Sequence, residues 1–322
     1  MLGVASRKTA DMAAFILILT MSLFSPQRSF SQTTRQEAPH AFYVWNVGQG
    51  LWTTYVTADI CFHFDMGGEY APWEQITSVC QKRFNQVYLT HWDLDHIGFV
   101  ARIARELTLV CLQSPPVGPA NPKKQDLLAK MPMCRPENKP ISSKVHVQNL
   151  MGELEDVLNY EHSSNELSQV FLIEGHAPIV VPGDSTVKKE KYWAKKLPPD
   201  GAWLLVLGHH GSRTSTSVEL LERLSFTRMA IASSRHARYG HPHLDVINRL
   251  KIKGIALLKT EDWGTLRFEV PARLPKPRGR MKTRQSRIIT ERISTADKAY
   301  TRGSNSERRV HRSRGRHRRL SP

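Results

Sequence analysis

One short segment, His91-Trp92-Asp93-Leu94-Asp95-His96, limits the folds and functions open to this chain, because four metal-competent side chains occupy its six positions. The segment follows an apolar run at 86–90 that predicts a buried strand, and it precedes an apolar stripe at 97–107 with helical spacing. A loop at the end of a strand can bring these side chains to one point, which a regular helix or strand cannot do at this spacing. Imidazole nitrogen and carboxylate oxygen suit zinc, manganese or iron, and four such groups so close together favour two metals over one. We therefore predict a metal site here; a charged loop with helix-capping carboxylates is the alternative.

The rest of the body alternates short apolar runs with turn residues and helical stripes. Strands are predicted at 42–47, 52–56, 60–64, 86–90, 145–147, 169–174, 178–181, 203–207, 229–232, 255–258 and 266–270. Helices are predicted at 72–84, 97–107, 218–224 and 244–250. Strands in two groups with interspersed helices predict an α/β fold in which two sheets lie between helix layers. Residues 113–145 are rich in Pro, Lys and Asn without a clear period, so we expect a long surface insertion over the active face.

The N-terminus has the layout of a secretory signal peptide over residues 1–31. Basic residues at 7 and 8 precede a mostly apolar run at 13–24, and Ser29-Phe30-Ser31 supplies small residues for cleavage. The apolar run is shorter than the roughly 20 residues of a membrane span, although an uncleaved anchor helix is the alternative. We expect export to the periplasm or the outside of the cell, with residues 32–40 as a polar linker.

The four cysteines, Cys61, Cys80, Cys111 and Cys134, form no Cys-x-x-Cys pair, which argues against a structural zinc site. In an oxidising compartment they can form two disulfides with three connectivities, among which the sequence does not choose. Buried free thiols are the alternative.

The net charge of +17 is unevenly distributed along the chain. Residues 273–322 hold 17 Lys and Arg against 3 Asp and Glu and carry +14, whereas the first 272 residues hold 29 against 26 and carry +3. The tail has few large apolar residues, so we expect it to be disordered. Clustered Arg with Ser and Gly predicts a nucleic-acid arm, because guanidinium groups pair with phosphates. Anionic envelope polymers or lipid surfaces are alternative partners, and a dispensable extension is a third interpretation.

Five motifs in order along the chain resemble the metallo-β-lactamase superfamily, and in particular the soluble hydrolase domain of ComEC-type DNA-uptake proteins. The first is the His91–His96 segment, in which Asp93 replaces the usual second His. The others are Val47-Gly-Gln-Gly50, Val181-Pro-Gly-Asp184, His209-His210-Gly211-Ser212 and Tyr239-Gly-His241-Pro242; Asn165-Glu-Leu-Ser168 stands where that family has an Asn-rich turn. The resemblance covers roughly residues 41–270. It implies a four-layer αββα sandwich, which we assign to a hydrolase domain at 41–272.

The resemblance also implies roles for individual residues. His91 and Asp93 would hold a first metal, and Asp95, His96 and His241 a second, with Asp184 between them. The carboxylate-rich set makes manganese a rival to zinc. His209, with His210 beside it, would donate a proton to the leaving oxygen or contact phosphate, and metal ligation by both is the alternative. Further expectations are phosphate or substrate contacts for Ser212, Asn165 and Ser168, with a helix N-cap as the alternative for Ser212, and support of the metal loop by Asp65.

The sequence departs from the family pattern at Leu51, where related domains have Asp after Val-Gly-Gln-Gly, and at Phe99, where they have Gly. We expect an exported metal-dependent hydrolase, a phosphodiesterase or nuclease acting on DNA through two divalent metal ions. Two metals can activate a water and stabilise the leaving oxygen of a phosphodiester. The alternatives are hydrolysis of another ester or amide, such as a lactone or β-lactam, and a non-catalytic polyanion-binding module on the same fold.

Overall fold

The structure, a computed structural model, describes residues 39–138, 144–152 and 163–272. The predicted signal peptide, most of the linker and the basic tail lie outside these residues, as does part of the predicted insertion. By its internal contacts the chain divides into Met1–Glu37 and Ala38–Pro322, and every described residue belongs to the second unit. In the described part of the chain, none of the helices has the length and apolar character needed to span a membrane.

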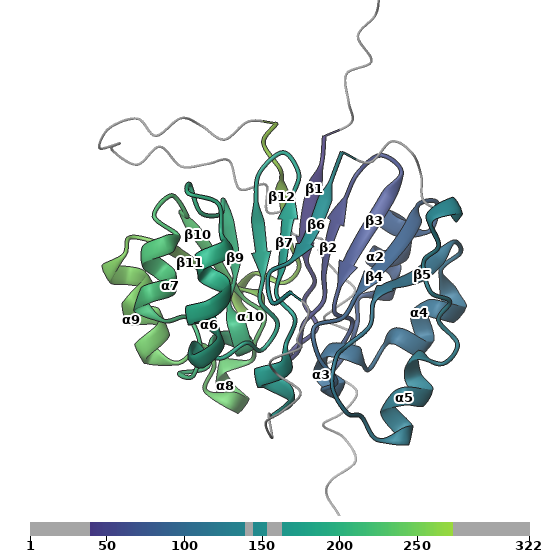
Figure 1. Ribbon diagram of the computed structural model, residues 1–322, viewed down its shortest axis with the longest axis horizontal. Helices are drawn as coiled ribbons and strands as arrows, with labels where there is room; N and C mark the ends of the chain where they lie inside the picture. The colour runs from purple at the N-terminus through teal and green to yellow at the C-terminus, as the bar shows by residue number, and fades with distance from the viewer. Residues whose placement is uncertain (1–38, 139–143, 153–162, 273–322) are drawn as a thin grey trace, which may run out of the picture. The chain divides into compact units, whose positions relative to one another are not determined.

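The described chain forms two six-stranded sheets, with strand orders β12-β1-β2-β3-β4-β5 and β11-β10-β9-β8-β7-β6 (Figure 1). The strands of the first sheet are β1 (Ala41–Val44), β2 (Thr53–Val56), β3 (Ile60–Phe64), β4 (Phe84–Tyr88), β5 (Val110–Ser114) and β12 (Leu266–Glu269). Those of the second sheet are β6 (His146–Asn149), β7 (Phe171–Glu174), β8 (Ile179–Val181), β9 (Leu204–Val206), β10 (Met229–Ala232) and β11 (Ala256–Lys259). Each sheet has an antiparallel part and a parallel part; β3, β4 and β5 run parallel, as do β8, β9, β10 and β11.

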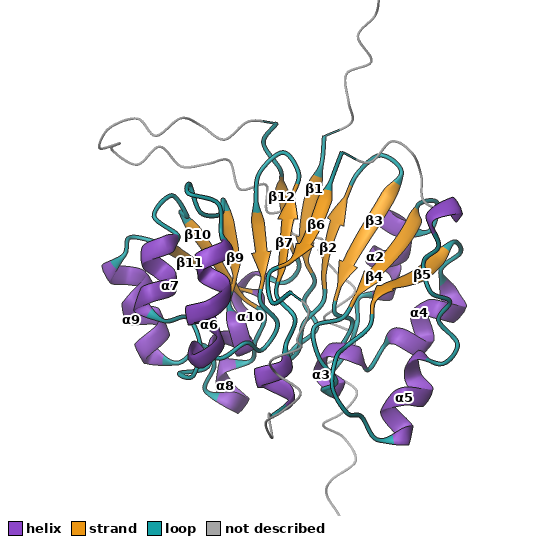
Figure 2. Ribbon diagram, viewed as in Figure 1, coloured by secondary structure: helices purple, strands orange, loops and turns teal. Residues whose placement is uncertain are grey.

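Helices cover the outer face of each sheet, because parallel neighbours need crossover connections (Figure 2). The first sheet is covered by α2 (Trp73–Cys80), α4 (Val100–Glu106) and α5 (Pro122–Leu128), and the second by α6 (Val187–Trp193), α7 (Val218–Arg223) and α9 (Leu244–Ile252). The short helices are α3 (Leu94–Ile97), α8 (His236–Tyr239), α10 (Thr260–Trp263), η1 (Pro136–Asn138), η2 (Ser164–Leu167), η3 (Ala194–Lys196) and η4 (Gly208–Gly211). The expected four-layer αββα arrangement is confirmed.

Alternation along the strands separates the core into layers. In β1, Phe42 and Val44 point into the core between the sheets, whereas Ala41 packs in the layer beneath the helices of the first sheet. Phe64 of β3 and Phe171 of β7 meet across the sandwich with ring centroids 5.6 Å apart. The two sheets are therefore fixed against each other, and so are the loops at their ends.

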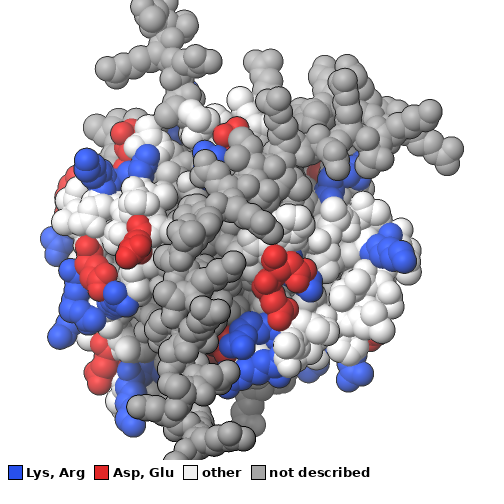
Figure 3. Space-filling model, turned by 180° about the vertical axis from the view of Figure 1, so that it is seen from behind, with Lys and Arg blue, Asp and Glu red and all other residues white. Residues whose placement is uncertain are grey.

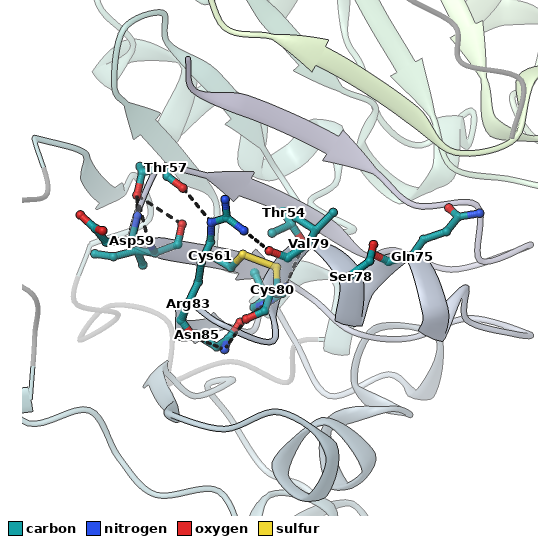
Figure 4. Close-up of a disulfide and its surroundings, with 12 residues drawn as sticks. Thr54, Thr57, Asp59, Cys61, Gln75, Ser78, Val79, Cys80, Arg83 and Asn85 are labelled. Atoms are coloured by element: carbon teal, nitrogen blue, oxygen red, sulfur yellow. Dashed lines mark hydrogen bonds between the residues drawn. A yellow bond between two sulfur atoms is a disulfide. The ribbon is translucent and has the colours of Figure 1, made fainter. Parts of the chain in front are cut away.

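All four cysteines are paired, as Cys61–Cys80 and Cys111–Cys134. The first pair joins β3 to the last residue of α2, and Arg83 beside it donates to the carbonyl oxygen of Thr57 at 3.0 Å (Figure 4). The second joins β5 to the segment after α5. The structure thus selects one of the three connectivities that the sequence left open.

The sequence suggested that segment 113–145 lacks regular structure. The structure differs, because this segment contains α5. Asn121 caps this helix by accepting from the Lys124 N–H at 3.0 Å, and Pro122 occupies its first turn. Asn before Pro at a helix start is a known signal. The apolar stripe was too short for its period to be recognised, since Leu128 is the only buried residue of α5.

The surface charge of the described body is mixed. On the part of the face in Figure 3 that is not covered by grey atoms, basic and acidic side chains are interspersed. This agrees with the near balance of 29 basic and 26 acidic residues in the first 272 positions.

Candidate two-metal site

Three loops meet at one end of the sandwich, where β4, β8 and β9 end. The loop after β4 carries His91 and leads into α3, the turn after β8 carries Asp184, and η4 after β9 carries His209 and His210. Helices α3 and α8 lie at this end (Figure 1). Parallel strands bring their carboxyl ends to one edge, which is where open α/β sheets place ligands.

The backbone of α3 is held against glycine loops of the first sheet. The Leu51 N–H donates to the Asp95 carbonyl oxygen at 2.9 Å, and the Met66 N–H donates to the His96 carbonyl oxygen at 2.6 Å. A Cβ atom on Gly67 would lie 2.2 Å from the Asp95 carbonyl carbon, so this approach requires glycine. These contacts explain why Gly67 lies so near the backbone of the metal loop.

Asp95, His96 and His210 form what we call the second half-site. His96 Nε2 lies 3.3 Å from His210 Nε2, and His210 Nε2 lies 3.2 Å from Asp95 Oδ2. Asp184 borders this group, since its Oδ1 is 3.1 Å from His96 Nε2 and 3.7 Å from His210 Nε2. The imidazoles of His96 and His210 are buried, and one ligand atom from each of the three residues lies within 4.8 Å of the others.

His91 and Asp93 form the first half-site, on the other side of Asp184. His91 Nε2 lies 3.4 Å from Asp93 Oδ2 and 3.8 Å from Asp184 Oδ2. His209 Nε2 approaches the same Asp184 oxygen at 3.6 Å. Each Asp184 oxygen therefore faces one half-site, the arrangement of a carboxylate shared by two cations.

The hydrogen bonds of the buried imidazoles determine which nitrogen faces the cluster. His96 Nδ1–H donates to Asp65 Oδ2 at 2.7 Å, and His210 Nδ1–H donates to the Ser233 carbonyl oxygen at 3.0 Å. The Thr90 hydroxyl donates to Asp65, so His91 Nδ1–H donates to Thr90 Oγ1 at 2.9 Å. All three rings consequently turn an Nε2 lone pair toward Asp184 when they are neutral.

The imidazole Nε2 lone pairs and the Asp184 oxygens can all bind a metal, but they cannot form hydrogen bonds with one another when the rings are neutral. His91 Nε2 and Asp184 Oδ1 are buried and have no hydrogen-bond partner among the described residues. Facing lone pairs and carboxylate oxygens are unfavourable unless a cation lies between them. Nitrogen and carboxylate donors match zinc or manganese, so the residues fit one divalent ion in each half-site.

The carboxylates are held in the ionised state that metal ligands need. Burial raises the pKa of Asp184, but the charges of His96 and His210 outweigh burial and hold that pKa well below its usual value. In the same way His210 and His96 lower the pKa of Asp95 to about 2 against the effect of burial. Burial lowers the pKa of His96, yet Asp184 and Asp65 raise it well above its ordinary value. The negative charges of Asp184 and Asp65 thus favour a positive charge at His96, which a proton supplies here and a bound metal ion would supply in its stead.

The pair His209-His210 adopts a left-handed backbone, with φ of 48° and 55°. Such conformations cost of the order of 1–3 kcal/mol each in residues other than glycine, and they persist where surrounding structure imposes them. Here the His209 N–H donates to the Gly183 carbonyl oxygen at 2.9 Å, and the Ser212 N–H donates to the His209 carbonyl oxygen at 2.7 Å. The turn directs both imidazoles toward Asp184.

His210, rather than His241, is the histidine that lies with Asp95 and His96. The sequence had suggested His241 for this position, because the left-handed turn that brings both neighbouring histidines inward leaves no trace in residue spacing. His241 lies at the side of the cluster, with its ring 6.0 Å from that of His209. Its Nδ1 is 3.5 Å from Gln49 Nε2, and Gln49 Oε1 accepts from the Arg235 N–H. Gln49 therefore donates to Nδ1, which leaves Nε2–H of His241 as a donor.

The other predicted site residues lie in different environments. Asn165 Nδ2 is 3.2 Å from His209 Nε2, at the cluster. Ser168 is buried, and its hydroxyl accepts from the Asp184 N–H at 3.1 Å, so it orients Asp184 instead of contacting substrate. The Ser212 hydroxyl is 3.0 Å from Thr214 Oγ1, whereas the N-cap of α7 is Ser217.

Asp65 lies behind the metal loop and is bonded to two of its residues. Its buried carboxylate accepts from the Thr90 N–H, the Thr90 hydroxyl and His96 Nδ1–H, each at 2.7 Å. The side chain of Leu51, where related domains have Asp, is buried in the core between the sheets. Its backbone N–H donates to the Asp95 carbonyl oxygen of the metal loop at 2.9 Å.

Lys124 is a site residue that sequence reasoning missed. Its Nζ lies 3.2 Å from Asp93 Oδ1, on the carboxylate oxygen that does not face His91. An interaction with His91 first, and then one with Lys124, lowers the pKa of Asp93. The Asn121-Pro122 start of α5 is the sequence signal that places a helix here, although it does not say which residue reaches the site.

A pocket of about 520 Å³ lies over the cluster. It is lined by Gln49, Gly68, Glu69, Asp93, Leu94, Asp95, Asn165, Asp184, His209, His210, Tyr239 and His241. The two buried histidines His91 and His96 lie beneath this surface. The pocket therefore gives a substrate access to Asp93 of the first half-site, to Asp95 and His210 of the second, and to Asp184 between them.

The chain matches no protein-family model. It is 30% identical over 234 residues to the competence protein ComA of Neisseria gonorrhoeae, a match that covers 71% of this chain and 32% of that protein. It is 28% identical over 200 residues to ComE operon protein 3 of Bacillus subtilis, covering 60% of this chain and 25% of that protein. The chain thus spans about a third or less of the curated relatives that it matches.

Similar solved structures include the metallo-beta-lactamase fold protein YhfI of Bacillus subtilis, with a TM-score of 0.44 and 11% identity over 69% of this chain and 96% of that one. A diphosphatase of the PhnP family has a TM-score of 0.43 and 16% identity over 71% of this chain and 97% of that one. Two observations agree: the described body has αββα layers with His and Asp motifs in order, and the sequence matches competence proteins. The chain resembles the metallo-β-lactamase superfamily and, within it, the competence proteins.

Proposed function

We propose that this protein is an exported metal-dependent hydrolase that cleaves the phosphodiester bonds of DNA. The observation that carries the proposal is Asp184, whose two oxygens face two separate groups of imidazole and carboxylate ligands at the floor of a pocket. Two divalent ions, zinc or manganese, would supply activation of water and stabilisation of charge on the phosphoryl oxygens. The similarity to competence proteins supports a nucleic-acid substrate.

The residues of this chain divide the remaining work. His91 and Asp93 would hold one ion, Asp95, His96 and His210 the other, and Asp184 both. His209 lies 3.6 Å from Asp184 Oδ2 and stays in reach of the first ion or of a phosphate oxygen.

His241 is the donor that faces substrate. Burial, reinforced by His210 and His209, lowers the pKa of His241 to about 4, so the ring is neutral at pH 7. With Nδ1 accepting from Gln49, its Nε2–H can donate to a phosphate or leaving oxygen. Asn165, which contacts His209, supplies a second polar group to the pocket wall.

The two disulfides support an oxidising compartment, and therefore export. Residues 273–322, which carry +14, would raise the local concentration of DNA without base-specific contacts. The proposed location is the periplasm or the outside of the cell, with membrane attachment if residues 1–31 stay uncleaved.

The test uses the full chain, freed of metal by a chelator and then given Mn²⁺ or Zn²⁺. Labelled single- and double-stranded DNA should be cleaved only with metal, and Asp184→Asn should lower the rate by at least about 100-fold, since even outer partners of metal ligands are worth 10–100-fold. Asp262→Asn, on the exposed end of α10, is the matched control and should keep full activity.

Binding of DNA without metal-dependent cleavage would overturn the proposal in favour of a polyanion-binding module. Cleavage of a lactone or β-lactam in place of DNA would overturn it in favour of another hydrolase.

A further inference from the structure

The pocket wall carries exposed apolar surface beside its ligands. Among the residues that line the pocket, Tyr239 is 43% exposed and Leu94 is 58% exposed. Large apolar side chains on a pocket wall are surfaces for a ligand to cover. A bare phosphate would leave Tyr239 and Leu94 exposed, whereas a ligand with an apolar or aromatic part next to its phosphate would cover them.

Tyr239 is well placed for such a contact. It ends α8 two residues before His241, and both side chains line the same pocket. The Arg238 guanidinium carbon lies 5.2 Å from the centre of the Tyr239 ring. An aromatic face with a guanidinium beside it is the combination that stacks a nucleobase and binds its phosphate.

Two arginines are held at this position by one carboxylate. Arg238 Nη1 lies 2.7 Å from Glu69 Oε1, and Arg235 Nη1 lies 2.8 Å from Glu69 Oε2. The three charges sum to +1, and a guanidinium has five N–H donors, so the bond to Glu69 leaves donors for a phosphate oxygen. Both arginine side chains remain exposed, Arg235 at 42% and Arg238 at 61%.

We call Glu69, Arg235, Arg238 and Tyr239 the platform; its residues come from loops and a helix of both sheets and are held by ion pairs and hydrogen bonds. Glu69 comes from the loop after β3, whereas Arg235, Arg238 and Tyr239 follow β10. Gln49 connects them, because its N–H donates to Glu69 Oε2 at 3.2 Å and its Oε1 accepts from the Arg235 N–H at 3.1 Å. A preformed platform reduces the ordering that binding would otherwise require.

We infer that Tyr239, Arg238 and Arg235 form a nucleotide subsite for single-stranded nucleic acid beside the metal ligands. Tyr239 stacks on an unpaired base, and the guanidiniums bind the phosphate of the neighbouring nucleotide. Bases inside a duplex are stacked on each other and cannot reach the ring, whereas every unpaired base presents an aromatic face. The subsite thus selects for single strands and tolerates any sequence; it rests on the proposed phosphodiesterase function.

The test measures binding of labelled oligothymidylate to the metal-free full chain by fluorescence anisotropy, at raised salt to weaken phosphate contacts. Tyr239→Ala should weaken binding about 10-fold, because it removes one base-stacking contact, and Tyr239→Phe should restore binding. The matched control is Tyr192→Ala, since Tyr192 is 65% exposed on α6 and does not line the pocket.

An abasic strand with the same phosphates separates stacking from charge. Tyr239→Ala should not weaken binding of the abasic strand further, whereas Arg238→Gln should weaken binding of both strands. Equal loss on both strands with Tyr239→Ala, or no loss on either, would overturn the subsite even if DNA is cleaved. Base-dependent binding through Tyr239 without metal-dependent cleavage would uphold the subsite as a binding site and reject only the proposed hydrolysis.

Discussion

The two half-sites differ in how firmly the protein holds them. In the second, His96 and His210 are buried, and each donates Nδ1–H to a fixed acceptor, Asp65 or the Ser233 carbonyl oxygen. In the first, His91 is buried as well, but it is the one imidazole of that half-site, and the outer oxygen of Asp93 is held by Lys124, a partly exposed residue of α5. Asp93 and Asp95 themselves are about equally exposed, at 35% and 38%. The second half-site is therefore organised by the core of the fold, and the first is completed by a surface helix.

This comparison predicts that the second half-site binds its metal more tightly than the first. Preorganised ligands lose less freedom on binding, and the orientation of an imidazole by an outer acceptor strengthens its coordination. Three substitutions test this difference between the half-sites, and a pH effect at a buried histidine outside them tests the core of the first sheet.

The largest effect is expected for His210→Asn. Asn tolerates the left-handed backbone that His210 adopts at φ 55°, so the change removes the imidazole without adding strain. Metal affinity at the second half-site should fall by more than about 100-fold, the upper figure for an outer partner alone. Isothermal titration with Zn²⁺ should then show one tight site fewer than in the unchanged protein. His243→Asn is the control, and two unchanged tight sites would contradict the assignment of His210.

A pH effect is expected at His63, a buried imidazole far from Asp184 in sequence and bonded to Asn85 Oδ1 at 3.0 Å. Burial lowers its pKa from 6.5 to about 4, so the folded ring stays neutral while the unfolded one takes up a proton below pH 6.5. The stability present above pH 6.5 is therefore lost as the pH falls toward 4, by about 3 kcal/mol in total.

Urea denaturation at pH 7, 6 and 5 of the metal-free protein checks this loss. His63→Gln should be less stable at pH 7 but should lose less stability on acidification than the unchanged protein. Parallel losses in the two proteins would show that His63 is not the group responsible.

Asp65→Asn should weaken metal binding by 10–100-fold, the range measured for outer partners of metal ligands. The change removes the charge that accepts from His96 Nδ1–H at 2.7 Å, so the second half-site should lose more affinity than the first. Competition with a chelating dye resolves the two sites. Thermal melting serves as control, because Asp65 also accepts from Thr90 and the fold must stay intact. Equal loss at both half-sites would break the comparison.

The smallest effect is expected for Lys124→Met, which removes the ammonium from Asp93 Oδ1. A partly exposed ion pair is worth about 1 kcal/mol or less, so affinity at the first half-site should change only about three- to five-fold. Lys124→Arg keeps the charge and should retain most of the affinity. A larger change at the second half-site than at the first, measured with the same dye, would show that Lys124 does not act through Asp93.

The sequence predicted most of the fold because its strands are short apolar runs between turn residues. It did not predict β5, whose last two residues fall in the segment expected to be an insertion, α5, whose single buried residue leaves no helical period, or α6, which begins after Thr186 without a side-chain cap. The strand at 86–90 and its following loop were predicted; β4 ends at Tyr88, and Leu89 and Thr90 lie between it and His91.

The residue types of the metal loop can be read directly from the amino-acid sequence, since His91, Asp93, Asp95 and His96 are close along the chain and a strand end must bring them together. Which distant residues lie next to this loop depends on the tertiary structure. Other loops and helices supply His210, His241, Lys124, Glu69 and Arg238, and the places of these residues depend on backbone conformation and on the packing of two sheets. A left-handed turn reverses the direction of a side chain without changing the spacing of residues, which is why the exchange of His241 for His210 was invisible in the sequence.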